Sequence, residues 1–162
     1  KRRVAIGAYV LMPNHFHILV KEITEGGLSC FMEKITTGYA KYFNMKYKHQ
    51  GPLLQGRFAA VPIASPAQLN VILRYINIKK VLDVYESDVK EKTPLDFLAF
   101  YPYSSFPDLF GNRSSQLVSQ EVRSTLKKMF GEDFFTNIED HIDSSKNFMK
   151  EQAKSYKDLF LE

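Results

Sequence analysis

The stretch AYVLMPNHFHILV, residues 8–20, decides how the rest of this chain is organised. Two apolar runs flank Met-Pro-Asn, and proline and asparagine are typical turn residues, so residues 4–12 and 15–21 are predicted to form a tight β-hairpin. Successive side chains of a strand point to opposite faces, which places His15 and His17 on one face of the second strand. Two imidazoles on one face are a candidate metal site, although exposed or hydrogen-bonded histidines have the same spacing.

The composition is that of a soluble globular protein. Of the 162 residues, 44% are hydrophobic and 25% are charged, and 22 Lys and Arg against 18 Asp and Glu give a net charge of +4. This charge favours an anionic partner. The single cysteine, Cys30, excludes an intrachain disulfide framework and a thiolate zinc cluster. No apolar run approaches the roughly 20 residues of a membrane span, so a cytoplasmic protein without a membrane partner is expected.

A helix is predicted over about residues 28–47, after the loop signal Gly26-Gly27, because apolar residues recur there at steps of three and four. Lysines occupy the other side of this helix. Such a face is either simply solvated or a surface that follows the phosphates of a nucleic acid, and the spacing supports both interpretations equally.

A further short strand is predicted over residues 57–63, and Pro62 places it at a sheet edge or near the end of a central strand. A well-marked helix start follows. Ser65 can cap the helix, Pro66 suits its first position, and Gln68 completes a capping box three residues on. This capped helix is expected to run to about residue 83.

The buried stripe of the capped helix consists of Leu69, Ile72, Leu73 and Ile76, continued by the stem of Lys80. At 100° per residue, Tyr75 and Lys79 lie together on one flank of that stripe, whereas Asn77 points elsewhere. Tyrosines usually bury the ring and solvate the hydroxyl. The residue type alone therefore gives no reason to prefer Tyr75 as a reactive group.

The remainder of the chain changes character twice. From Val84 to about Gly111 a charged run is followed by an aromatic, proline-containing loop over residues 97–107, which is expected to pack back on the domain. The remainder is predicted to be helical, with one helix that contains Val122, Leu126, Met129 and Phe130 and ends at Gly131, another at about 133–142 and a third from Phe148 on. The chain is therefore expected to form a domain over residues 1–111 and a C-terminal helical extension over residues 112–162.

Four motifs occur in an order that is typical of one family. They are Met12-Pro13-Asn14-His15-Phe16-His17, Gly51-Pro52-Leu53-Leu54-Gln55-Gly56-Arg57-Phe58, Arg74-Tyr75-Ile76 and Tyr103-Ser104-Ser105. With these motifs, over about residues 5–110, the chain resembles the HUH class of single-tyrosine, IS200-like DNA transposases. The resemblance is closest to the REP-associated tyrosine transposases of bacteria.

The resemblance implies an α+β fold with a ferredoxin-like antiparallel sheet, packed helices and C-terminal helices. In that fold the first strand and helix would precede residue 1 or be supplied by another chain, and the first strand would lie between the strand over residues 57–63 and the hairpin. The implied activity is that of a metal-dependent DNA strand transferase. It would cleave and rejoin single-stranded, hairpin-bearing DNA through a covalent 5′-phosphotyrosine intermediate, as a monomer or a homodimer.

The resemblance also implies roles for individual residues. Tyr75 would be the nucleophile, and His15 and His17 would hold a divalent metal ion, Mg²⁺ or Mn²⁺. Lys79 and Arg57 are candidate contacts of the phosphate. Candidate DNA-binding residues on the helix over 28–47 are Lys41, Lys46, Lys48 and Tyr39, where lysines would contact the backbone and tyrosine rings would stack on bases.

One position departs from the family pattern. Members usually carry Asn or Gln as a third metal ligand where this chain has Lys79, and a protonated lysine has no lone pair to offer a cation. Either Lys79 contacts the scissile phosphate, or a residue upstream of Lys1 supplies the ligand, or the copy is catalytically weakened. Two rival functions follow. One is a domesticated DNA-binding protein that no longer cleaves, and the other is a metal phosphodiesterase in which Tyr75 only packs.

Overall fold

A computed structural model describes residues 2–54, 56–88, 93–111, 113–131 and 142. Along the chain the elements are β1 (Val4–Leu11), β2 (Phe16–Glu22), α1 (Gly27–Tyr47), α2 (Pro66–Arg74), the π-helical turn η1 (Tyr75–Lys79), α3 (Lys80–Asp88), α4 (Pro94–Phe100), α5 (Phe106–Leu109) and α6 (Gln120–Phe130). The α+β class is confirmed. Apart from Ile142, the helices expected over 133–142 and beyond residue 148 lie outside the described residues.

The hairpin is formed as the sequence predicts. β1 and β2 pair antiparallel, with Val10 opposite His17 and Leu11 opposite Phe16. The Met12 amide donates to the His15 carbonyl at 2.9 Å and closes the turn. β1 is buried along most of its length, whereas β2 is half-buried and becomes exposed at its end.

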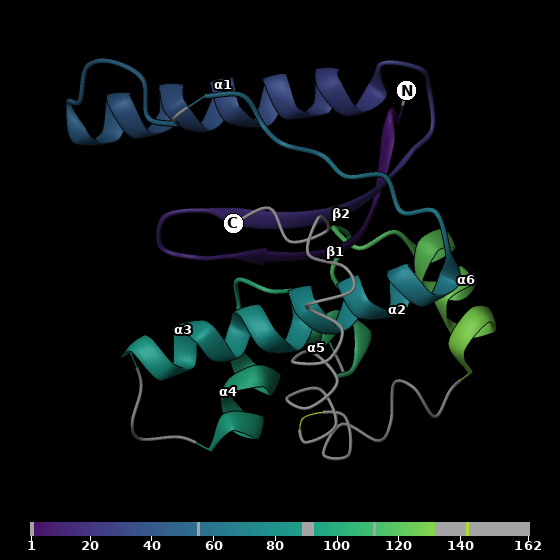
Figure 1. Cartoon of the computed structure of the whole chain (residues 1–162). Coiled ribbons are helices and arrows are strands. Elements are labelled where there is room, and N and C mark those ends of the chain that lie inside the picture. Colours follow the sequence, from purple (N-terminus) through teal and green to yellow (C-terminus); the bar gives the residue numbers. More distant parts are fainter. Residues whose placement is uncertain (1, 55, 89–92, 112, 132–141, 143–162) are drawn as a thin grey trace.

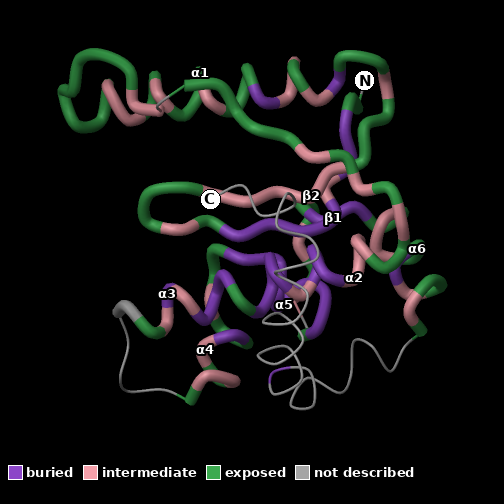
Figure 2. Tube along the Cα trace, viewed as in Figure 1, coloured by how far each residue is buried: buried purple, intermediate pink, exposed green. Residues whose placement is uncertain are grey.

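Helices lie on both sides of this hairpin. Figure 1 shows α1 on one side and the continuous run of α2, η1 and α3 on the other. The core lies on the second side, where buried residues of β1 pack against those of α2, η1 and α3. In α1 only Gly27 and Met32 are buried, and Figure 2 shows this helix largely exposed. The side of the hairpin that faces α2 and α3 is therefore the better packed one.

The segment Tyr103–Ser105 lies along the outer edge of β1. Val10 forms an isolated antiparallel bridge with Ser104, the Leu11 amide donates to the Tyr103 carbonyl at 2.8 Å, and the Ser105 amide donates to the Tyr9 carbonyl at 2.8 Å. This edge of the sheet is thus occupied by a segment that is almost one hundred residues downstream.

The predicted strand over residues 57–63 is wrong. This segment has no strand pairing, and residues 57–60 are exposed. The outer edge of β1 is occupied by Tyr103–Ser105, so residues 57–63 do not pair there. The described residues thus form a two-stranded sheet, and the full ferredoxin-like sheet stays a prediction.

The aromatic segment was predicted as a loop and instead contains two short helices. Thr93 caps α4 by accepting a hydrogen bond from the Asp96 amide at 3.2 Å, and Pro94 occupies the first turn. Leu98 and Phe106 are buried in the core, which confirms that the segment packs back on the domain. The capped helix also runs further than expected, because α3 ends at Asp88.

The residues that follow position 111 pack on the same hairpin. The Ser119 amide donates to the Ile6 carbonyl at 2.8 Å, and Val118 and Leu126 belong to the same buried cluster as β1. α6 ends at Gly131, as predicted. Described residues on both sides of position 111 thus share one buried cluster, and the division into a domain over 1–111 and a helical extension over 112–162 stays a prediction.

Candidate active site

The helix that carries Tyr75 starts where the sequence predicts. It also contains a π-helical turn, which the sequence does not predict. Ser65 Oγ accepts a hydrogen bond from the Gln68 amide at 3.2 Å, so the cap is confirmed. Residues 75–79 form η1, and the Lys80 amide donates to the Tyr75 carbonyl, five residues back. A single π-helical turn inside an α-helix is frequently found at a functional site.

Asn77 explains why the helix widens at this point. Its Nδ2 donates to the Leu73 carbonyl at 2.9 Å, which gives a side-chain partner to a carbonyl in the last turn of α2. Its Oδ1 accepts a hydrogen bond from Ser105 Oγ at 2.7 Å, and the whole residue is buried. A side chain that serves the helix backbone in this way stabilises the irregular turn.

Ser105 joins this turn to β1. Its Oγ accepts a hydrogen bond from the Tyr9 amide at 2.7 Å, in addition to the bond that it donates to Asn77. The neighbouring residue Val10 lies opposite His17 in the hairpin. One buried hydroxyl therefore joins the tyrosine-bearing turn to β1, the strand that pairs with β2.

The three residues that the sequence selected lie together. The ring centroids of His15 and His17 are 5.1 Å apart, and those of His17 and Tyr75 are 5.4 Å apart, with both pairs edge-on. His15 is exposed, His17 is half-buried and Tyr75 is 3% exposed. The arrangement can offer imidazole nitrogens beside a tyrosine, and its chemical role stays a prediction.

The two histidines fit a divalent metal ion in part. His15 Nδ1 lies 2.7 Å from Asn14 Oδ1, and when Nδ1 donates that hydrogen bond Nε2 keeps its lone pair for a metal. Among the described residues no group of three His, Cys, Asp or Glu side chains could hold an ion. A metal bound by two imidazoles would take its other ligands from water or from phosphate oxygens.

The lysine nearest to Tyr75 is Lys80. Lys79, the predicted phosphate contact, is exposed, and its Nζ lies 2.9 Å from Asp83 Oδ1. Lys80 is buried, and its Nζ lies 5.1 Å from the Tyr75 ring centroid and 3.4 Å from Asp83 Oδ2. Regular α-helical geometry does not predict this contact, because residue i+5 lies about 140° away from residue i.

The remaining candidate DNA-binding residues lie elsewhere. Arg57 is exposed in the connection between α1 and α2. On α1, Lys41, Lys48 and Tyr39 are exposed, and Lys46 Nζ stands over the rings of Tyr42 and Tyr47 at 5.5 and 5.2 Å. In Figure 1 the C-terminal half of α1 and the tip of the hairpin extend toward the same end of the molecule.

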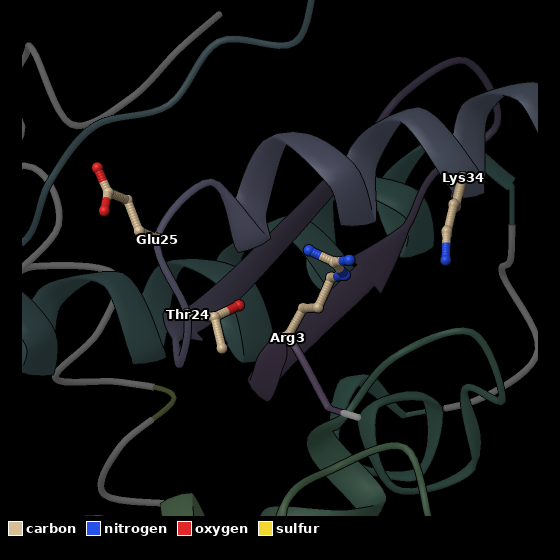
Figure 3. A pocket seen from close by; sticks show the side chains of 4 residues that line it. All are labelled: Arg3, Thr24, Glu25 and Lys34. Atoms are coloured by element: carbon tan, nitrogen blue, oxygen red, sulfur yellow. The ribbon is translucent and has the colours of Figure 1, made fainter.

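A separate hollow lies beside the start of α1. It has a volume of about 310 Å³ and is lined by Arg3, Thr24, Glu25 and Lys34. In Figure 3 the Arg3 and Lys34 side chains lie on the same side of the helix, and Glu25 points away from them. None of its lining residues is His15, His17 or Tyr75, so this hollow is not the candidate active site.

Replacing Ser105 by alanine is expected to lower the free energy of unfolding by about 2–3 kcal/mol, because the Tyr9 amide and Asn77 Oδ1 lose their partner in a dry interior. Ser104→Ala is the matched control. Ser104 is equally buried, but its hydroxyl makes only long hydrogen bonds of 3.3 and 3.4 Å, so a loss of at most about 1 kcal/mol is expected. Urea denaturation of both variants measures the difference, and equal losses would show that the link from Ser105 to the turn contributes nothing.

Comparison with known families matches residues 1–79 to the family described as "Transposase IS200 like". The matched residues include His15, His17 and Tyr75, and they end at Lys79. Curated proteins and solved structures gave no match. None of the helices in the described part of the chain is long and apolar enough to cross a membrane.

Proposed function

We propose, from the match of residues 1–79 to the IS200-like transposase family, that this chain is a DNA transposase that cleaves and rejoins single-stranded, hairpin-bearing DNA through a covalent phosphotyrosine at Tyr75. Binding to DNA and a role in transposition follow from the family. One observation supports the proposed role of Tyr75. His15 and His17 lie close to Tyr75 in space, although the histidines and the tyrosine are far apart in sequence.

The proposed reaction conserves the number of phosphodiester bonds. Tyr75 Oη forms a bond to phosphorus as the bond from phosphorus to the 3′ oxygen breaks. The tyrosine proton passes to solvent, and the 3′ oxygen takes up a proton to become a hydroxyl. A 3′ hydroxyl of another strand can later displace Tyr75 in the reverse sense, so that rejoining needs no ATP.

A tyrosine hydroxyl has an ordinary pKa near 10 and attacks an unactivated phosphodiester poorly. A divalent ion, Mg²⁺ or Mn²⁺, held by His15 and His17 would supply Lewis-acid activation by neutralising non-bridging phosphate oxygens. The hydrogen bond between Asn14 and His15 orients one imidazole for this task. Imidazole is a less usual ligand for Mg²⁺ than for transition metals, so Mn²⁺ is the better first choice in an assay.

The burial of Tyr75 sets a condition on the reaction. Because this residue is 3% exposed in the DNA-free chain, a phosphodiester reaches its hydroxyl only after the surroundings of the ring rearrange. Bound DNA is the natural source of the required free energy, since a ligand that prefers one arrangement shifts the population toward it.

One specific observation favours a second function, that of a DNA-binding protein without cleavage activity. Lys79 stands where the family usually has an amide ligand, and its ammonium is engaged by Asp83. The described residues then offer two imidazole donors beside Tyr75, His15 and His17, and no group of three His, Cys, Asp or Glu side chains that could hold an ion. A protein that binds DNA but no longer cleaves it fits these facts, and so the test must measure binding and cleavage separately.

The test uses the full chain and a labelled single-stranded oligonucleotide that contains a small hairpin. The protein is incubated with the oligonucleotide in Mn²⁺, in Mg²⁺ and in EDTA, and the products are separated under denaturing conditions. A labelled protein band that requires the metal is the expected result. Chelation is expected to remove the band without removing DNA binding.

Two other outcomes identify the rival functions. Cleavage of the oligonucleotide without a covalent band would indicate a metal phosphodiesterase that uses water as the nucleophile. Binding without cleavage in any metal would indicate the DNA-binding protein. Restoring the amide with Lys79→Asn then tests whether weak metal binding is the cause, because activity should appear only if a third ligand was missing.

A further inference from the structure

We propose that Lys80 is the cation that binds the phosphate at Tyr75, both during attack and in the phosphotyrosine intermediate. This inference rests on the proposed function, because it assigns a charge partner to the same reacting group. It replaces Lys79, which the sequence selected for that role. Lys80 contributes charge and hydrogen bonds only.

The position of Lys80 relative to Tyr75 carries the argument. Its Nζ lies 5.1 Å from the centroid of the Tyr75 ring, over the ring face, within the range of a cation–π interaction. His17 meets the same ring edge-on at 5.4 Å. The ring that would be esterified thus has both an imidazole and an ammonium group as neighbours.

The π-helical turn is what brings Lys80 there. In η1 the Lys80 amide bonds to the Tyr75 carbonyl five residues back, so residue i+5 approaches the flank of residue i more closely than in an α-helix. Asn77 and Ser105 hold this turn from the buried side. The same irregularity leaves Lys79 at the surface, with its side chain 47% exposed.

The local charges favour an anion. Lys80 Nζ lies 3.4 Å from Asp83 Oδ2, and Lys79 Nζ lies 2.9 Å from the other oxygen of the same carboxylate. The three side chains together carry a net charge of +1. A phosphodiester adds one negative charge, which this net charge can balance. The Lys80 side chain is only 6% exposed, and a buried ammonium is costly unless it is paired, whereas an apolar side chain would pack there without that cost.

The experiment compares Lys80→Met, which removes the charge at similar volume, with Lys79→Met, which removes the same charge one residue away at an exposed position. A methylphosphonate, which has no charge, replaces each phosphate of the hairpin oligonucleotide in turn. Binding is measured in EDTA, where no metal contributes to phosphate recognition. The rate of adduct formation is measured in Mn²⁺ at saturating DNA.

In the wild-type protein one methylphosphonate position is expected to weaken binding roughly 10-fold or more, as for loss of a hydrogen bond to a charged group, and this position should coincide with the cleavage site. In Lys80→Met the penalty at that position is expected to vanish, and the rate of adduct formation to fall roughly 10- to 100-fold. Lys79→Met should keep both properties within about twofold, because its charge is solvated. Lys80→Arg should retain the penalty.

The proposal would be overturned if Lys80→Met formed the adduct at the wild-type rate. It would also be overturned if a methylphosphonate at the cleavage position still weakened DNA binding by Lys80→Met. If Lys80→Met does not fold, the wild type and Lys80→Arg are compared instead. The proposal is then contradicted if a methylphosphonate at the cleavage position does not weaken DNA binding in one of these two proteins. A wild-type protein that forms no adduct contradicts the proposed strand transfer instead. The binding measurements in EDTA keep that failure separate from a failure at Lys80.

Discussion

Tyr75→Phe is expected to abolish the covalent DNA adduct, with a loss of at least about 10³-fold, because the hydroxyl that would form the ester is removed. The ring should stay in place, since its contacts with His17 and Lys80 and its burial do not depend on the oxygen. DNA binding and thermal stability should therefore change little. The measurement is the labelled protein band on a denaturing gel, together with a melting curve.

Tyr85→Phe is the matched control for this variant, because Tyr85 lies ten residues further along the same continuous helix and packs against Phe97 rather than His17. The control should form the adduct at the wild-type rate. An adduct that persists in Tyr75→Phe would place the nucleophile on another residue. Adducts lost in both variants would indicate a general effect of the helix rather than a reaction of one hydroxyl.

Arg113→Met is expected to cause the largest loss of stability, about 3 kcal/mol, because it leaves the Asp108 carboxylate buried without its cation. Asp108 is 1% exposed and is bound by Arg113 through Nε at 3.0 Å and through Nη2 at 2.6 Å. Arg113 also donates to Tyr9 Oη and to the carbonyls of Pro102 and Ser104. About a third of the Arg113 side chain is exposed, which is why the lower end of the range for buried pairs applies.

The pH dependence of that loss follows from Asp108. Burial acts to raise the pKa of Asp108, but hydrogen bonds from Arg113 and Ser115 lower it more, so the pKa lies below the ordinary value of 3.8. The stabilisation by the ionised pair is present above that ordinary value and is lost as the pH falls through the lowered pKa of the folded state. Urea denaturation should therefore show a difference between wild type and Arg113→Met that is full near neutral pH and narrows below about pH 3.8.

Lys21→Met is the control for Arg113→Met. The ion pair of Lys21 and Glu121 has a similar N to O distance of 2.9 Å, but both side chains are more than half exposed. No change in stability beyond experimental error is expected, because exposed pairs are screened by solvent. Equal losses in the two variants would mean that burial of Asp108 does not set the energy of its pair.

The parts of the fold that the sequence predicts correctly are those decided by local rules. The hairpin at Pro13 and Asn14, the periodic helix α1 and the capped start at Ser65 all follow from neighbouring residues. The strand over residues 57–63 failed because a strand needs a partner, and local residues do not reveal which edge is available. Tyr103–Ser105 occupies the edge of β1 instead, and no periodic pattern marks a segment of three residues.

The candidate site likewise contains residues that the sequence could identify and residues that it could not. His15 and His17 could be placed on one face by alternation alone, and Tyr75 was selected through a resemblance of motifs. Lys80 and Asn77 were missed as members of the site, because regular α-helical geometry places neither on the flank of Tyr75. The only local signal was a lysine in a stripe of buried apolar positions. A buried ammonium needs an anionic partner, so a lysine at such a position indicates that an anionic group lies nearby.

The hydrogen bonds between Ser105 and Tyr9 also set an order of assembly. These residues are 96 positions apart, so closing the contact costs far more chain entropy than forming the hairpin or the first turns of α1. During synthesis the two histidines and Tyr75 leave the ribosome well before Ser105 does. Until this late segment has been made, the turn that carries Tyr75 lacks the buried hydroxyl that joins it to β1 in the folded protein.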